Sequence, residues 1–290
     1  MNSRSHYLVA ILLPLVWMGA VARSQGQRPL QVSLAPATIR PGDVVRITID
    51  DAGVGEHVTA QVLGQDVTLE HDTHDQKWRG FFGVDLETAP GSYSIVIQPS
   101  ARTSPATRTL QVVPRQFRIR RLTVAPEFVE PPPETLEQIA RDSKALAEAY
   151  ARISPRQWTG AFELPVSGKP SSNFGTRSYY NGKPRAPHAG VDFASGTGTP
   201  IRAANHGTIA LAAPLYFTGN TIVIDHGARL FSVFAHLSEF SVKPGDVVEP
   251  QTIVGRVGST GRVTGPHLHW SVRLNGARVD PLSLIAITSQ

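Results

Sequence analysis

The chain has 290 residues, of which 41% are hydrophobic and 18% are charged, and its formal net charge is +5. This composition excludes disorder driven by high charge, and the 25 glycines and 23 prolines exclude a long coiled coil and favour short strands. Cysteine is absent, which removes disulfides, thiolate metal sites and a cysteine nucleophile. The basic balance suits an anionic surface such as a membrane or cell wall. Without a basic stripe that carries interleaved aromatic residues, we expect no nucleic-acid partner.

The first 22 residues have the pattern of a secretory signal peptide. Arg4 precedes an apolar run from Tyr7 to Ala22, and this run ends in the small-residue pattern Ala-Val-Ala. We therefore expect residues 1–22 to be removed and the mature protein to be exported to the periplasm or cell envelope. An uncleaved membrane anchor is the alternative. However, a run of 16 residues that contains Pro14 is shorter than the roughly 20 residues that a spanning helix needs.

Residues 29–113 have the pattern of a small, immunoglobulin-like β-sandwich. Apolar and polar residues alternate in short runs, and turn signals such as Pro41-Gly42-Asp43 and Pro90-Gly91-Ser92 separate these runs. The segment from His71 to Asp75 contains residue types that bind metals. Its position ahead of the core aromatic Trp78 favours a solvated hairpin tip instead.

Residues 114–157 are predicted to connect the sandwich to a second domain. Three consecutive prolines at 131–133 stop the strand pattern, and Thr135 followed by Gln138 resembles a capping box. Apolar residues then recur at helical spacing between Leu136 and Tyr150. This pattern predicts a helix over about 134–152 that packs on a neighbouring domain.

Residues 158–290 return to a strand pattern, which predicts a mainly β domain built from antiparallel sheets. Six of the ten histidines of the chain lie between positions 188 and 269 of this part. His188 and Asp192 are four residues apart, so a straight strand would separate their Cα atoms by roughly 13 Å. A kink at Gly190 would let both side chains meet at one ion, whereas two unrelated surface residues are the alternative.

His267 and His269 form a more specific pair. On a strand they share one face, while Leu268 and Trp270 point to the other face and can enter a core. Two imidazoles about 7 Å apart suit a division of labour in which one binds a metal and the other faces the substrate. A pair of surface histidines on an edge strand is the alternative.

The other three histidines of this region differ in context. His236 ends an apolar strand, from which a catalytic side chain can project into a groove. His206 and His226 each precede a glycine and are interpreted as turn residues outside the site.

Five ordered motifs between about residues 165 and 283 resemble those of the lysostaphin-type (LytM-type) zinc metalloendopeptidases. Five motifs in the order of the family are far more specific than any one of them. The connector also resembles that of family members with an N-terminal β-sandwich. The motifs are Ser172-Asn173-Phe174-Gly175-Thr176-Arg177, His188-Ala189-Gly190-Val191-Asp192, Ile224-Asp225-His226-Gly227, Phe234-Ala235-His236-Leu237, and the segment from Gly258-Ser259-Thr260-Gly261 to Gly265-Pro266-His267-Leu268-His269.

This resemblance implies that His188, Asp192 and His269 bind one Zn²⁺ per chain and that His236 and His267 are catalytic histidines that do not bind it. Two imidazoles and one carboxylate leave one position of a tetrahedral zinc open, as in catalytic sites. The resemblance further implies an exported endopeptidase that hydrolyses peptidoglycan stem peptides or cross-bridges. We favour His267 as general base, because it is two residues from a ligand on the same strand face.

Two other functions match parts of the sequence. A catalytically silent wall-binding or hydrolase-activating module of the same fold would have lost ligands, whereas this chain has kept them. A lipoyl- or biotinyl-type carrier needs a modified lysine in a tight hairpin, and Lys243 before Pro244 is poorly placed for it. Because the sandwich offers no catalytic set, we expect a fragment that starts near Trp158 to fold and to cleave soluble peptides.

Overall fold

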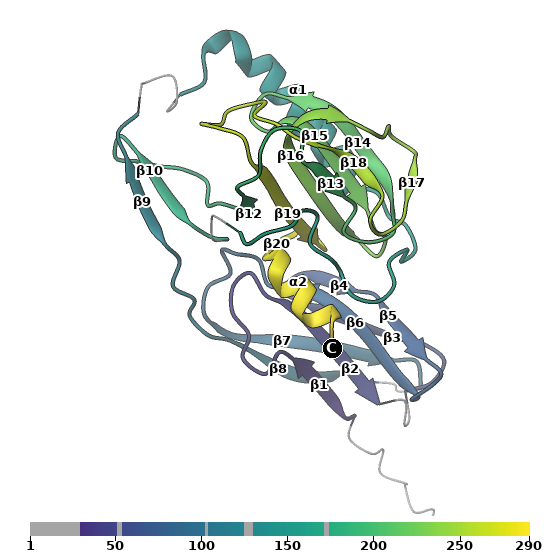
Figure 1. Ribbon diagram of the computed structural model, residues 1–290. Coiled ribbons are helices and arrows are strands. Elements are labelled where there is room, and N and C mark those ends of the chain that lie inside the picture. The colour runs from purple at the N-terminus through teal and green to yellow at the C-terminus, as the bar shows by residue number, and fades with distance from the viewer. Residues whose placement is uncertain (1–29, 51–53, 102–103, 125–129, 171–173) are drawn as a thin grey trace, which may run out of the picture.

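The computed structural model describes residues 30–50, 54–101, 104–124, 130–170 and 174–290. The predicted signal peptide of residues 1–22 lies outside these ranges, as do residue 29 and the first two residues of the motif that begins at Ser172. Within the described ranges, no helix is both long and apolar enough to cross a membrane. Strands dominate the fold, as predicted, and form two lobes joined by a connector (Figure 1).

The N-terminal lobe is the predicted β-sandwich. One four-stranded sheet has the order β1-β2-β6-β5 and the other has the order β4-β3-β7-β8. Alternate side chains of both sheets meet in a closed apolar core, in which Ile47, Phe82 and Ile97 are fully buried. The strands are β1 (Val32–Ala35), β2 (Val44–Asp50), β3 (Val58–Val62), β4 (Gln65–Val67), β5 (Leu69–Asp72), β6 (Lys77–Gly83), β7 (Gly91–Pro99) and β8 (Ala106–Val112).

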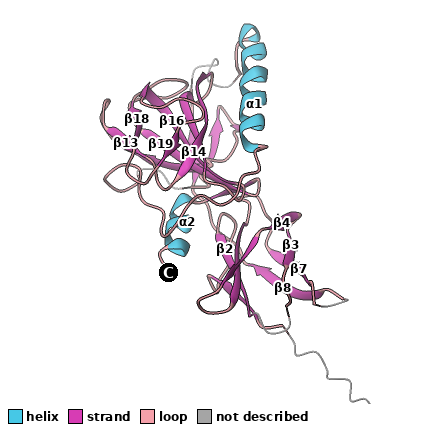
Figure 2. Cartoon of the chain, turned by 90° about the vertical axis from the view of Figure 1, so that its right-hand side faces the viewer, coloured by secondary structure: helices cyan, strands magenta, loops and turns pink. Residues whose placement is uncertain are grey.

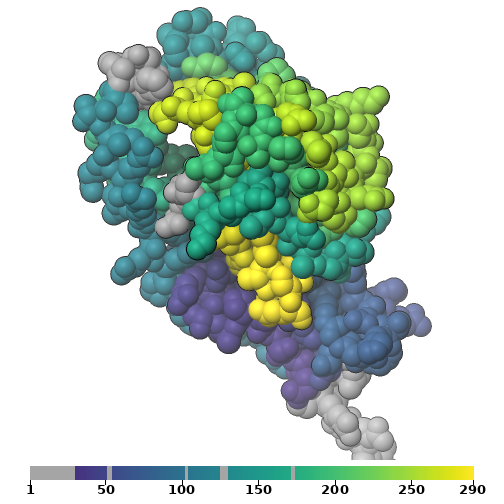
Figure 3. Space-filling view, in the orientation of Figure 1, coloured from purple at the N-terminus to yellow at the C-terminus, as the bar shows by residue number. Residues whose placement is uncertain are grey.

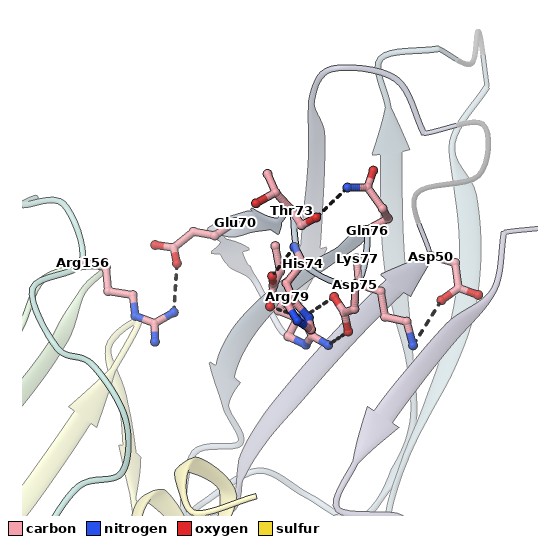
Figure 4. Close-up of polar contacts among 10 residues, drawn as sticks. Asp50, Glu70, Thr73, His74, Asp75, Gln76, Lys77, Arg79 and Arg156 are labelled. Carbon is pink, nitrogen blue, oxygen red and sulfur yellow. Dashed lines mark hydrogen bonds and ion pairs between the residues drawn. The ribbon is translucent and has the colours of Figure 1, made fainter.

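The segment from His71 to Asp75 lies at the β5–β6 hairpin, as predicted (Figure 4). The guanidinium of Arg79 donates to the carboxylate of Asp72 at 2.8 Å and to that of Asp75 at 2.9 Å. The ring of His71 stacks on Trp78 at a centroid distance of 5.0 Å. An internal cation therefore neutralises these carboxylates, and the hairpin has a structural explanation.

The C-terminal lobe contains a nine-stranded sheet whose pairings are antiparallel. Its main path is β12-β19-β16-β15-β14-β17, with β13, β18 and β20 attached beside it. The predicted fold class is thereby confirmed. The strands are β12 (Gly190–Phe193), β13 (Pro200–Arg202), β14 (Gly207–Leu215), β15 (Gly219–Asp225), β16 (Leu230–Phe240), β17 (Val247–Val248), β18 (Ile253–Val257), β19 (Leu268–Leu274) and β20 (Ala277–Val279).

Strand β19 separates the two faces of this sheet. Leu268, Trp270 and Val272 are fully buried in the main core, whereas His269 and Arg273 alternate with them and face the opposite side. The sequence predicted this alternation for the two histidines and the residues between them.

The connector contributes a small sheet that the sequence did not predict. Strand β9 (Ile119–Leu122) pairs in parallel with β10 (Arg177–Tyr180), and β10 pairs with β11 (Lys183–Pro184). These strands lie beside the large sheet, at the left of Figure 1. The connector is therefore part of the folded C-terminal lobe.

The predicted connector helix is present. A 3₁₀ turn, η2 (Pro133–Thr135), leads into α1 (Leu136–Tyr150), which stands alongside the large sheet (Figure 2). The predicted capping box is wrong, because the Thr135 hydroxyl donates to the carbonyl of Pro132 at 2.7 Å and does not cap the helix. Packing of Ala149 against Phe231 and Val233 bears out the expected contact with a neighbouring domain.

A second helix, α2 (Pro281–Thr288), was not predicted. Asp280 caps it by accepting a hydrogen bond from the backbone of Leu282 at 3.1 Å, and Arg115 of the connector binds the same carboxylate at 2.7 Å. Figure 3 shows this C-terminal helix, in yellow, seated on the sandwich. The helix thus helps to join the two lobes.

Apolar and ionic contacts tie the lobes together. Val44 and Leu86 of the sandwich belong to the main core of the C-terminal lobe. Arg278 donates to Asp85 at 2.7 Å, and Arg156 donates to Glu70 at 2.9 Å (Figure 4). Removal of the sandwich would expose part of this core, so a fragment from Trp158 is expected to be less stable than the whole chain, and its independent folding stays a prediction.

Candidate metal centre and groove

Three of the predicted site residues converge at one point. His188 precedes β12, Asp192 lies within it, and His269 is the residue opposite Asp192 on β19. Nε2 of His188 is 3.0 Å from Oδ1 of Asp192 and 3.1 Å from Nδ1 of His269, and the last two atoms are 2.8 Å apart. Because β12 begins at Gly190, His188 and Asp192 do not lie on one straight strand, and their side chains meet.

The chemistry of this His-Asp-His cluster, made of His188, Asp192 and His269, fits a metal ion. Two imidazole nitrogens and one carboxylate oxygen converge at this spacing, and one cation between them would be bound by all three. A tetrahedral zinc ion with bonds of about 2.0–2.1 Å holds its ligand atoms roughly 3.3 Å apart. The observed separations are close to that value.

The surroundings of Asp192 and His269 favour the protonation states that bind metals, an ionised carboxylate and a neutral imidazole. Burial opposes the charge of Asp192, but hydrogen bonds from His188 and His269 outweigh burial and hold the pKa of Asp192 well below its usual range. Burial lowers the pKa of His269 and so favours the neutral ring. An ionised carboxylate and a neutral imidazole are the states that metal binding requires.

His236 faces this cluster from β16. Its ring centroid is 4.8 Å from that of His267 and 6.1 Å from that of His269. Nδ1 donates to the carbonyl oxygen of Thr260 at 2.9 Å, which leaves Nε2 as the acceptor. Burial is the main reason that the pKa of His236 falls to about 4, so this ring is neutral near pH 7.

His267 is the second catalytic candidate, and its ring packs beside that of His236. Its Nδ1 donates to the carbonyl of Gly265 at 2.9 Å, and its Nε2 lies 4.0 Å from Oδ1 of Asp192. Both histidines therefore have Nδ1 held by a backbone carbonyl and Nε2 left to accept a proton. The carbonyls of Thr260 and Gly265 are functional groups that sequence reasoning missed, since no residue type marks them.

A groove of about 530 Å³ surrounds the five residues. The β9 segment of the connector lines one side of it through Arg120 and Leu122. Tyr180 and Arg185 lie on the same side, and Arg262 lines the groove from the loop before β19. The molecular surface is hollowed between the connector and the large sheet (Figure 3). The sequence analysis predicted neither strand β9, whose residues Ile119–Leu122 do not alternate, nor its place at the groove.

The two remaining histidines of the C-terminal lobe, His206 and His226, lie apart from the site, as predicted. His226 is fully buried, with Nδ1 2.6 Å from the carbonyl of His206 and Nε2 2.9 Å from the hydroxyl of Ser232. Its ring also packs edge-on against Phe162 at 4.9 Å. His226 is thus a core histidine, more deeply placed than a turn residue usually is.

Comparison with known proteins gives three relevant matches. The model of peptidase family M23 matches residues 186–281. The DD-carboxypeptidase/endopeptidase Mpg of Neisseria meningitidis is 42% identical over 103 residues, which cover 36% of this chain and 24% of that protein. The peptidoglycan DD-endopeptidase ShyA of Vibrio cholerae is 39% identical over 113 residues, which cover 39% of this chain and 26% of that protein. The chain thus spans about a quarter of the length of these curated relatives.

A solved structure extends the similarity to both lobes. It is a Pseudomonas aeruginosa protein described as an M23 peptidase, with 33% identity, a TM-score of 0.67 and coverage of 87% of this chain and 96% of that one. The protein is therefore an enzyme of the metallopeptidase class, as predicted from the sequence. Because this similarity spans almost the whole of the Pseudomonas chain, the protein belongs to peptidase family M23. The roles of the five site residues stay predictions.

Proposed function

We propose that this protein is an exported zinc endopeptidase that hydrolyses peptide cross-links of bacterial peptidoglycan. One observation carries the proposal: the metal-binding atoms of the His-Asp-His cluster lie within 3.1 Å of one another in an open groove, and two further histidines face them. A silent module of the same fold would have no need of this arrangement.

His188, Asp192 and His269 would hold the metal through Nε2, Oδ1 and Nδ1. Bound zinc supplies Lewis-acid polarisation of the scissile carbonyl and lowers the pKa of water into the neutral range. The sheet contributes rigidity, because Asp192 and His269 are register partners on adjacent strands and their backbones cannot drift apart.

The two other histidines, His267 and His236, have different roles in proton transfer. His267, with 22% of its side chain exposed, is the general base: its Nε2 accepts the proton of water and returns it to the leaving amine. His236 is the more deeply buried ring, and a pKa of about 4 makes it a weak proton acceptor. Its Nε2 instead orients the attacking water by accepting a hydrogen bond.

Peptidoglycan is favoured as substrate by two independent features. The relatives from Vibrio and Neisseria that share the catalytic part carry names that specify DD-endopeptidase activity. The signal pattern of residues 1–22 would deliver the enzyme to the compartment that contains the wall. A groove that lies along the sheet accommodates an extended peptide better than a folded protein.

The test combines metal analysis with digestion of purified wall. The mature protein is expected to bind one zinc per chain and to release muropeptides that mass spectrometry identifies as products of cross-link cleavage. His269→Ala should abolish both, because it leaves two ligands. His206→Ala is the matched control and should preserve both, since only the backbone carbonyl of His206 contacts a neighbouring ring.

Two results would contradict the proposal. Stoichiometric zinc in the His269→Ala variant would remove this residue from the ligand set. Zinc-loaded wild-type protein that leaves the wall intact, yet binds it, would favour the wall-binding module instead.

A further inference from the structure

Helix α1 covers one end of the sheet face that carries the site. From His269, the residues of β19 on this face continue with Ser271 and Arg273. On β16, Ala235 pairs with His269, Val233 with Ser271 and Phe231 with Arg273. The site thus lies at one end of this face and Arg273 at the other, four residues or about 13 Å along the strand.

The end of the helix is fixed over Arg273. The ring of Tyr150 packs on Phe231 at a centroid distance of 5.6 Å, and the guanidinium of Arg273 lies 4.8 Å from the centre of the Tyr150 ring. About two turns earlier on the helix, the carboxylate of Asp142 accepts a hydrogen bond from the backbone of Tyr216 at 2.6 Å. A peptide chain in the groove cannot pass through this packed end.

A cavity of about 200 Å³ remains between the site and the helix. Ala189, Thr218 and His269 line both this cavity and the groove, so the two spaces adjoin at the metal cluster. Tyr150 and Arg273 line the opposite part of the cavity. The space is therefore a short extension of the groove that ends at a cation.

Two arginines line this cavity, and only one of them, Arg278, is paired with carboxylates. Arg278 donates to Asp85 and Glu87, each at 2.7 Å. Arg273 is half-buried, and its guanidinium donates to the carbonyl of Gly276 at 3.4 Å and to the hydroxyl of Tyr150. Across the described ranges of the chain, no carboxylate forms an ion pair with Arg273. A partly desolvated guanidinium of this kind favours an anionic ligand.

We propose that this cavity is a subsite for a short, carboxylate-terminated arm of the substrate and that Arg273 determines this specificity. The inference rests on the proposed peptidase function and deepens it. With the scissile bond at the metal cluster, the 13 Å to Arg273, less the reach of its side chain, leaves room for about two extended residues. The enzyme then prefers a bond close to a free carboxylate, and α1 excludes substrates whose chain continues.

The experiment compares one cross-linked muropeptide in two forms, with free carboxylates and with these carboxylates converted to carboxamides. For the wild type, kcat/KM should be about 10- to 100-fold higher for the free acid, as a charge-assisted hydrogen-bond pair would give. Arg273→Gln should lose this preference with little change toward the amide, and Arg273→Lys should retain part of it. Arg141→Gln, at a site on α1 with 70% of its side chain exposed, is the matched control and should retain the full preference.

Zinc content and the unfolding midpoint, measured for each variant, separate loss of recognition from loss of structure. Equal rates on both forms of the muropeptide, or a preference that survives in folded Arg273→Gln, would overturn the subsite. If the wild type cleaves neither form, the proposed function has failed. In that event, calorimetric titration of the two forms into wild type and Arg273→Gln still tests the subsite, because only the wild type should bind the acid more tightly.

Discussion

His236 adopts a backbone conformation that a histidine rarely takes. Its φ is 68°, in the left-handed region, where the β15–β16 register also shifts. The backbone N–H of His236 donates to the carbonyl of Thr218 at 2.8 Å, and the ring is fixed by Thr260. Strain of this kind persists where the surroundings over-determine it, often at functional sites. Here it turns the ring toward the metal cluster.

The first prediction separates proton-transfer residues from ligands. His236→Ala and His267→Ala should each keep stoichiometric zinc, because neither residue belongs to the converging cluster. Both should lower kcat by roughly a hundredfold or more, as expected when general acid–base assistance or water positioning is lost. Zinc analysis beside kcat is the measurement. Loss of zinc from the His267→Ala variant would show that the two histidines of β19 have been assigned in reverse.

A second prediction concerns pH and the buried His226. Burial lowers the pKa of this ring to about 4, below its ordinary value of 6.5. The unfolded chain therefore binds the extra proton first, so the contribution of His226 to stability is complete above pH 6.5 and is lost as the pH falls toward 4. The shift corresponds to roughly 3 kcal/mol of unfolding free energy.

Chemical denaturation at pH 7.5 and pH 4.5 measures this loss. His226→Gln removes the titrating group, so the variant should be less stable at pH 7.5 yet show a smaller decrease on acidification than the wild type. An equal decrease in both proteins would assign the acid sensitivity to other groups.

At the scale of elements, the sequence predicted what depends on local pattern. Leu268, Trp270 and Val272 alternate with polar residues, so β19 and the shared face of its histidines were readable. The range of α1 followed from its apolar spacing. The parallel pairing of β9 with β10 joins residues that are 58 positions apart, such as Arg120 and Ser178, and no local signal encodes it.

The same distinction explains the misses at the ends of helices and in the site. Asp280 followed by Pro281 is a helix start signal, but the apolar residues after it suit a strand as well as a helix. Thr135 has the right residue type for a cap, yet its hydroxyl binds the preceding turn. The spacing of His188 and Asp192 indicated a metal site, whereas the cavity at Arg273 depends on how α1 packs.

The third prediction tests how the connector supports the site. Gly175 has φ of 80°, and a Cβ at this position would lie 2.1 Å from the ring of Phe117. Its N–H also donates to the carbonyl of His188 at 2.8 Å. Gly175→Ala should therefore cost about 1–2 kcal/mol for the left-handed backbone and a further 1–3 kcal/mol for overpacking, and it should lower kcat by displacing His188.

Gly182→Ala is the matched control for this substitution. Gly182 has the same φ of 80°, but a Cβ there would meet no atom within 4 Å. It should show the backbone cost alone and retain activity. Denaturant unfolding and kcat for the two variants measure the difference, and equal costs would mean that the Phe117 contact adjusts freely.

For the whole molecule, we expect the interface to make the two lobes one folding unit. Leu86 of the sandwich is buried in the core of the C-terminal lobe, and a Cβ on Gly83 would lie 2.7 Å from Val279. Arg115 of the connector bonds to Asp280 and the carbonyl of Pro41, one group from each lobe. Close packing of this kind transmits strain, so damage in one lobe should lower the stability of the other.

The last prediction concerns a substitution that creates a cavity in the sandwich core and its effect on the stability and activity of the catalytic lobe. Ile95 on β7 is fully buried in the sandwich core, far from the groove in the sequence and in another sheet. Ile95→Ala should destabilise by about 2–5 kcal/mol and lower the unfolding midpoint by roughly 5–15 °C. Calorimetry should show one transition, and hydrolytic activity should be lost at the same reduced temperature.

Val247→Ala, at a position that is 75% exposed on β17, is the control and should leave the midpoint almost unchanged. Two separate transitions, with activity retained up to the wild-type temperature, would show instead that the lobes unfold independently and that the shared core around Leu86 does not couple them.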